Sequence, residues 1–172
     1  MVTVADLLAV DGLALRALGG PTGTALRWVA TSELDDPTPF LEGGELLLTT
    51  GLRVAGATAP GGGDWPGWVA GLARAGVAAV GFGVGLGHRE VPAGLVAAGH
   101  ELGVGVLEVP PPTPFIAISR AVADLLQRGE QAADTAALQT VRELTREAGG
   151  AAAAPRVLRR LAAAVGGVAW LL

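Results

Sequence analysis

Three short, largely apolar segments constrain the fold of this chain more than any other feature. They cover residues 45–50, 77–82 and 104–109, and polar residues do not alternate with apolar ones along them. Strands that are buried on both faces have this pattern, and they belong to parallel sheets that helices cover on both sides. We therefore predict a parallel sheet at the centre of the fold.

The segments between these strands carry the signals of helices. Asp64 and Pro66 are typical of the first residues of a helix, and Gly76 is placed to end it. Pro92 and Gly103 bracket a second helix in the same way. Strands that alternate with helices at this short spacing form βαβ units. The predicted fold class is α/β: a sandwich with a mainly parallel sheet flanked by helices.

Weaker signals precede and interrupt this pattern. Thr3 and Asp6 have the spacing of a capping box for a helix over residues 4–9. Residues 13–18 and 26–30 have the composition of short strands. Glycine, proline and alanine dominate residues 53–63, which we expect to form a long loop.

A long helical segment follows the third apolar strand. Thr113 and Pro114 begin it, and apolar residues at helical spacing continue as far as Gly149. We expect one long connecting helix, kinked near Gly129. The predicted domains are an amino-terminal domain over 1–127, a connecting or signalling helix over 128–150, and the start of a truncated middle domain over 151–172.

The last predicted domain contains a helix over 156–165 and an apolar strand over 168–172. Such a strand would be left unpaired at the end of the chain, so we expect the natural protein to continue beyond it.

Composition and charge exclude several classes of protein. The chain has no cysteine, which excludes disulfides and thiolate metal sites and agrees with a cytoplasmic location. Its net charge of −4 argues against a nucleic-acid-binding surface. The longest uncharged central run, residues 75–87, is too short to span a bilayer, and residues 1–11 lack the basic start of a signal peptide. We expect a cytoplasmic protein without membrane contact.

Three stretches, in a fixed order, resemble one family of bacterial regulators. The stretches are PFLEGGELLLTTG at 39–51, GVAAVG at 76–81, and LEVP at 107–110 followed by TPF at 113–115 and ISR at 118–120. They are similar to the amino-terminal domain of PucR-type transcription regulators, and the resemblance covers roughly residues 4–126.

This resemblance implies a function. The amino-terminal domain of such a regulator senses a metabolite, often one linked to purine or nitrogen catabolism, and a middle domain and a carboxy-terminal helix-turn-helix domain follow it. DNA would be bound only through that missing carboxy-terminal domain. The resemblance does not fix the small-molecule effector, nor whether the regulator activates or represses.

The sequence also indicates where a ligand would bind. In parallel α/β sheets, ligands bind beyond the carboxyl ends of the strands. Glycines there allow close backbone approach, threonines supply hydroxyls, and an arginine can pair with a carboxylate or a polar heterocycle. A helix that begins at such an edge adds free N–H groups. The candidate ligand-binding residues are Thr49, Thr50, Gly51, Arg53, Gly83, Gly85, His88, Arg89, Thr113 and Phe115.

Plainer interpretations of these motifs stay open. Thr113 followed by a proline is an ordinary helix start, residues 49–51 can simply end a strand, and His88 can be a polar loop tip. Glu42 and Glu45 flank a turn without a nearby histidine, so solvated charges or a cap suit them better than acid–base catalysis.

We predict neither catalysis nor a cofactor or metal. His88 and His100 are the only histidines, and two scattered histidines without cysteines form no metal site. The glycines between residues 81 and 87 lack the spacing of a dinucleotide-binding loop. A small hydrolase or transferase is therefore the least favoured reading.

Two functions remain in competition for the domain. It can be a ligand sensor that signals through the long helix, or a dimerisation scaffold of the same regulator without a ligand of its own. In both cases the apolar stripe of the helix, which includes Leu138, Val141 and Leu144, predicts a homodimer.

Overall fold

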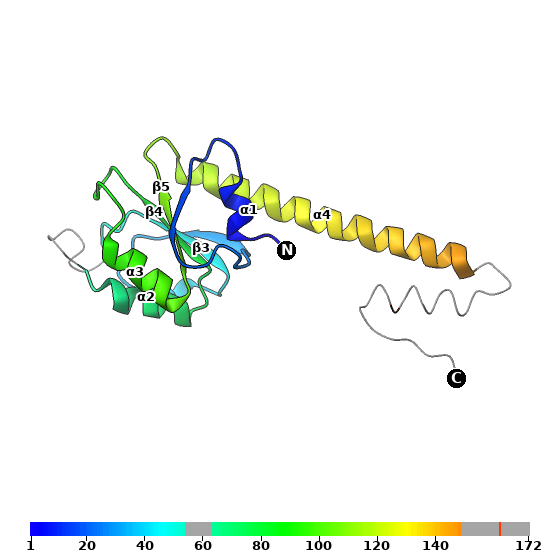
Figure 1. Cartoon of the computed structure of the whole chain (residues 1–172), viewed down its shortest axis with the longest axis horizontal. Coiled ribbons are helices and arrows are strands. Elements are labelled where there is room, and N and C mark those ends of the chain that lie inside the picture. Colours follow the sequence, from blue (N-terminus) through cyan, green and yellow to red (C-terminus); the bar gives the residue numbers. More distant parts are fainter. Residues whose placement is uncertain (54–62, 149–161, 163–172) are drawn as a thin grey trace. The chain divides into compact units, whose positions relative to one another are not determined.

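The computed structural model describes residues 1–53, 63–148 and 162 (Figure 1). The strands are β1 (Arg16–Gly19), β2 (Trp28–Thr31), β3 (Glu45–Thr49), β4 (Ala79–Gly83) and β5 (Gly105–Val109). The helices are α1 (Val4–Leu8), the 3-10 helix η1 (Thr38–Phe40), α2 (Trp65–Arg74), α3 (Ala93–Leu102) and α4 (Phe115–Ala148).

The five strands form one sheet in the order β1-β5-β4-β3-β2. The four strands from β2 to β5 are parallel, and β1 is antiparallel to β5 at one edge. A bidentate ion pair between Arg16 and Glu108, with contacts of 2.8 and 3.1 Å, joins these two strands. The prediction of a sandwich with a mainly parallel sheet, followed by a long helix, is confirmed.

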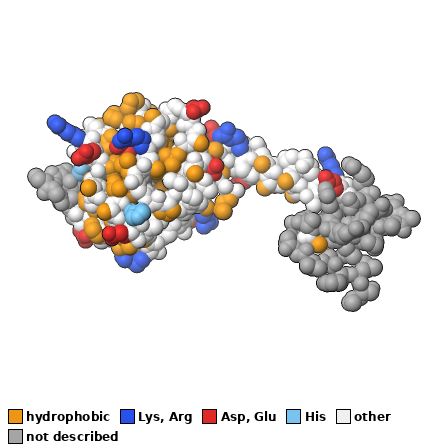
Figure 2. All heavy atoms as spheres, in the orientation of Figure 1, with side chains coloured by type: hydrophobic (Ala, Val, Ile, Leu, Met, Phe, Trp, Pro, Cys, Tyr) orange, Lys and Arg blue, Asp and Glu red, His pale blue; other side chains and the backbone are white. Residues whose placement is uncertain are grey.

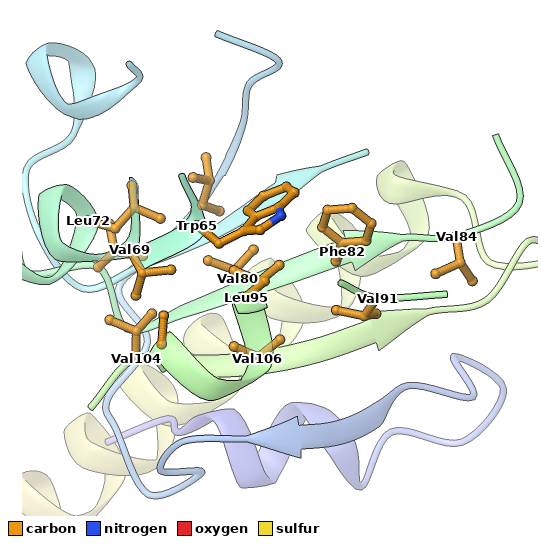
Figure 3. Close-up of a cluster of buried hydrophobic side chains, with 13 residues drawn as sticks. Trp65, Val69, Leu72, Val80, Phe82, Val84, Val91, Leu95, Val104 and Val106 are labelled. Carbon is orange, nitrogen blue, oxygen red and sulfur yellow. The ribbon is translucent and has the colours of Figure 1, made fainter. Parts of the chain in front are cut away.

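Helices cover both faces of the sheet and bury a hydrophobic cluster on each (Figure 1). On one face, α2 and α3 pack against β3, β4 and β5, and Figure 3 shows Trp65, Val80 and Phe82 at the centre of this cluster. On the other face, α1 and the first turns of α4 pack against the same strands, with Leu7 and Ile118 fully buried. The strands are apolar without alternation because both of their faces are covered.

The predicted helix starts have the expected caps. The Thr3 side chain accepts a hydrogen bond from the Asp6 N–H, and the Asp6 carboxylate accepts one from the Thr3 N–H. The Asp64 carboxylate accepts a hydrogen bond of 2.9 Å from the Gly67 N–H at the start of α2. Gly103 ends α3 in the left-handed conformation, with φ of 71°, which glycine adopts without steric cost.

Several boundaries differ from those predicted. The first strand begins at Arg16 and not at residue 13, because Leu13 is buried in the core instead of extending the edge strand. In the described part of the chain, the 3-10 helix η1 lies between β2 and β3, where no helix was predicted. α4 runs without interruption through Gly129, where a kink was expected.

The chain divides into two compact units, residues 1–127 and residues 128–172. The first contains the whole sheet, and the second contains the distal half of α4. The loop expected over 53–63 and the helix and strand expected over 156–172 fall almost entirely on residues 54–62 and 149–172, which lie outside the described part except Ala162. Within the described residues, no helix has the length and apolar character needed to cross a membrane.

Candidate functional site

The connections that leave β4 and β5 diverge at the carboxyl edge of the sheet. β4 leads into α3, which lies on one face, whereas β5 leads into α4, which lies on the other. Neighbouring strands whose following helices go to opposite faces leave a crevice between their ends, which is where open α/β sheets bind ligands. A pocket of about 460 Å³ lies at this position. Its volume is within the range of small-molecule sites.

Apolar groups make most of the pocket wall. Leu52, Val84, Leu86 and Phe115 contribute side chains, and Pro110, Pro111 and Pro114 contribute rings. Two glycines allow these groups to approach the strand ends. A Cβ on Gly83 would lie 3.0 Å from Cζ of Phe115, and a Cβ on Gly85 would lie 2.7 Å from Cγ of Pro111. Any side chain at either glycine would therefore push the wall of the pocket outward.

Among the described residues that line the pocket, Glu33 is the charged one. A network of hydrogen bonds holds its side chain in place. Its Oε1 accepts hydrogen bonds from the N–H and the hydroxyl of Thr50, at 2.6 and 2.8 Å. Its Oε2 accepts one from the Thr49 hydroxyl at 3.1 Å and one from the Leu52 N–H at 3.3 Å. Four donors thus join the segment after β2 to the end of β3 and the residues after it, and these charge-assisted hydrogen bonds stabilise the carboxylate without neutralising it.

Thr113 fixes the start of α4 from the other side of the pocket. Its hydroxyl donates a hydrogen bond of 2.7 Å to the carbonyl oxygen of Leu13, and both residues are buried. Its N–H donates to the carbonyl oxygen of Pro110 at 3.0 Å. The first turn of α4 is therefore anchored both to the segment before β1 and to the end of β5.

Five of the ten residues predicted to bind a ligand line this one pocket. They are Thr50, Gly83, Gly85, Thr113 and Phe115. Thr49 lies directly behind the wall, where its hydroxyl donates to Glu33. The pocket therefore brings together residues from all three of the predicted strand ends.

The other four predicted residues lie elsewhere. Gly51 is buried with φ of 71°, and a Cβ on it would lie 2.7 Å from the ring of Phe82. Arg53 and Arg89 are exposed and do not line the pocket. His88 packs its ring against the ring of Phe82, with a centroid distance of 5.3 Å.

Sequence reasoning missed Glu33 and Thr31, which also line the pocket. Both follow the strand predicted over residues 26–30, so the carboxyl end of this strand was the signal that could have found them. Elsewhere, Glu45 is buried and accepts hydrogen bonds from the N–H groups of Glu42 and Gly43 at 2.6 to 3.0 Å. It therefore caps a turn. Among the described residues, no group of three or more His, Cys, Asp or Glu side chains could hold a metal ion.

The sequence profile of the purine catabolism regulatory protein-like family, PucR, matches residues 5–126 of this chain. The chain belongs to this family. The matched PucR segment contains the whole sheet and every residue that lines the pocket. PucR is a regulatory family, so the domain is part of a regulator.

The other two comparisons add little to the family assignment. No curated protein matches the chain. One similar solved structure contains the CBS and DRTGG domains of the regulatory region of Clostridium perfringens pyrophosphatase, complexed with its activator diadenosine tetraphosphate. The TM-score is 0.43 with 14% sequence identity, over 70% of this chain and 45% of that one. The chain thus spans less than half the length of that structure.

Proposed function

We propose that this PucR domain is the ligand-sensing module of a cytoplasmic bacterial transcription regulator. The observation that carries the proposal is the pocket at the diverging ends of β4 and β5, whose wall includes Phe115 at the start of α4. A ligand in this pocket would contact the helix that continues into the second unit. Binding can shift such a regulator only by its differential affinity for two arrangements, and α4 is the element placed to carry that difference.

The remaining parts of the proposal extend the family assignment. The effector is a metabolite of purine or other nitrogen catabolism, and DNA is bound by a carboxy-terminal helix-turn-helix domain of the regulator. The chain's net charge of −4 supports this division of roles. On the face of the α/β unit drawn in Figure 2, basic and acidic side chains are interspersed, and no extended basic patch is seen there.

A panel of purine-breakdown intermediates, amino acids and small amines, tested by thermal shift, examines the sensor proposal. A ligand at about a hundred times its dissociation constant adds roughly 2.7 kcal/mol, which raises the midpoint by several degrees. Leu86→Trp places a large ring at the mouth of the pocket, where Leu86 is 81% exposed, and should abolish the shift. Leu102→Trp, at the exposed end of α3 away from the pocket, is the matched control and should keep it.

A dimerisation scaffold is the second candidate, and one observation favours it. On the distal half of α4, Leu138 and Val141 are 60% and 59% exposed, although both are large apolar side chains. A flat thermal-shift panel on a well-folded dimer would favour the scaffold function, with sensing placed in a middle domain of the regulator.

Both candidates include a homodimer that uses the stripe of Leu138, Val141 and Leu144. Replacing all three with glutamine should yield monomers in light scattering at micromolar concentration, since the exposed side chains of Leu138 and Val141 are apolar surface that a partner would cover. Glutamine at Ala132 and Ala136 is the matched control, because at 100° per residue these positions lie on the opposite side of the helix. A dimer that survives the triple substitution contradicts this part of the proposal.

A further inference from the structure

The pocket offers hydrogen-bond acceptors and negative charge but few free donors. We propose that it selects neutral or cationic molecules with several N–H donors, such as amides, ureides and amidines, and rejects anions of the same shape. This inference names the ligand class of the site and rests on the proposed sensor function.

The charge of the pocket is the first observation. Among the described residues that line it, Glu33 is charged, and no arginine or histidine faces it. Arg53 and Arg89, which the sequence suggested as partners for a carboxylate, are exposed and outside the lining. A bound anion would therefore lose water without gaining a cationic partner, which is costly in an apolar pocket.

The threonine hydroxyls are the second observation. The Thr50 hydroxyl contacts a carboxylate oxygen of Glu33, and the Thr113 hydroxyl contacts the carbonyl oxygen of Leu13. Neither of these oxygens carries a proton, so each hydroxyl is the donor and its own proton is used. Both threonines thus present only lone pairs to a ligand.

Several backbone N–H groups of the lining residues are also engaged within the protein. The N–H groups of Thr50 and Leu52 donate to Glu33, that of Val84 to the carbonyl of Val109 at 3.1 Å, and that of Gly85 to the carbonyl of His88 at 2.7 Å. The three prolines of the wall have no N–H group.

Donors that remain include the Thr31 hydroxyl and the N–H of Phe115 in the first turn of α4, which has no intrahelical acceptor. One or two carbonyl oxygens on a ligand can use these groups. Its other polar atoms meet threonine lone pairs and the charge of a carboxylate, so donors suit them better than acceptors. A planar molecule with one carbonyl and several N–H groups fits this pattern, and the ring of Phe115 gives it an apolar surface.

Benzamidine, benzamide and benzoate test the inference, because they share one ring and one size but are cationic, neutral and anionic. Dissociation constants for the full chain are measured by titration in two-dimensional ¹H–¹⁵N NMR, with shifts at Gly83, Gly85 and Phe115 reporting on the pocket. We expect benzamidine and benzamide to bind at least tenfold more tightly than benzoate, which corresponds to about 1.4 kcal/mol. This ratio of dissociation constants is measured on the unaltered protein, so it does not depend on whether any variant folds.

Variants then assign the selectivity to the pocket. Glu33→Gln removes the charge and turns one acceptor into a donor, so the ratio of benzamidine to benzoate affinity should fall at least fivefold. Glu42→Gln is the matched control, since Glu42 is exposed and outside the lining, and the ratio should stay unchanged. Thr113→Val, which removes one acceptor without changing charge, should weaken benzamide by several-fold.

The outcomes separate the two proposals. Benzoate, or an anionic member of the wider panel, binding in the pocket at least as tightly as the amide overturns the donor-rich ligand class and leaves the sensor function standing. If no compound of either set binds in the pocket, the sensor function fails and this inference fails with it.

Discussion

Replacing Glu33 with alanine should destabilise the domain more than substitutions of partly exposed loop residues usually do. The carboxylate accepts four hydrogen bonds, and two of their donors are the N–H and hydroxyl of Thr50, which is only 7% exposed. Alanine would remove all four acceptor contacts at once. The connection between the segments after β2 and β3, which forms one wall of the pocket, would be lost with them.

The expected magnitude follows from how well water can replace the carboxylate. A buried donor left without an acceptor costs about 1–3 kcal/mol. Three donors meet this condition, the N–H and hydroxyl of Thr50 and the hydroxyl of Thr49, whereas the N–H of Leu52, a residue that is 51% exposed, can donate to water instead. Because Glu33 is itself partly exposed, some water will reach the site. We therefore expect the free energy of unfolding to fall by about 2–4 kcal/mol.

Urea denaturation followed by tryptophan fluorescence measures this loss. With a slope of about 1–3 kcal/mol per molar urea, the midpoint should fall by roughly 1–2 M. Glu42→Ala serves as the control, because Glu42 is exposed, and the change should be within about 0.5 kcal/mol. A Glu33→Ala midpoint equal to that of the control would refute the reasoning that the four contacts hold the loops together.

Three further predictions test other parts of the fold. Gly99→Ala should cost about 1–3 kcal/mol in urea denaturation, because a Cβ there would lie 2.3 Å from a β5 side chain and 2.8 Å from a backbone oxygen; an unchanged midpoint would contradict the close packing of α3. Thr113→Val leaves the buried Leu13 carbonyl without its donor and should lower the free energy of unfolding by about 1–3 kcal/mol. Thr113→Ser keeps the hydroxyl and should lower it less. Hydrogen bonds from Thr3 lower the pKa of Asp6, so its contribution is present at neutral pH and is lost as pH falls through that lowered pKa. Asp6→Asn should therefore flatten the acid side of the stability profile, and a profile parallel to wild type would count against it.

The central strands and helices were predictable because their signals are local. β3, β4 and β5 are short apolar segments that must be buried on both faces, whatever their partners are. The start of α2 was predictable for the same reason, since Asp64 caps it through a residue three positions away.

The pairing of β1 was not predictable because its signal is not local. Its residues are exposed or half-buried, so no burial pattern marks them, and their partners on β5 lie about ninety residues further along the chain. The β1 boundary follows from Leu13, which leaves the edge to enter the core.

The candidate site was predictable only in part. The carboxyl ends of parallel strands share one edge, which is enough to bring Thr50, Gly83 and Thr113 together. The direction of a loop side chain is not contained in such reasoning. His88 therefore looked like a pocket residue but packs against Phe82, whereas Glu33 was missed and reaches Thr50 across seventeen positions.

The position of α4 links the pocket to the rest of the chain in a specific way. Its first turn is fixed at Thr113 by the Leu13 carbonyl, while Phe115, two residues later, faces Gly83 in the pocket wall. A ligand that fills the pocket must contact the Phe115 ring. The conformation of the first turn of α4 therefore affects how well the ligand fits. If the ligand binds one arrangement of that turn a hundredfold more tightly than another, it shifts the equilibrium between them by about 2.7 kcal/mol. Such a shift is enough to turn an even population into one that is 99% in the favoured arrangement, so the proposed sensor needs contact with only one side chain of α4.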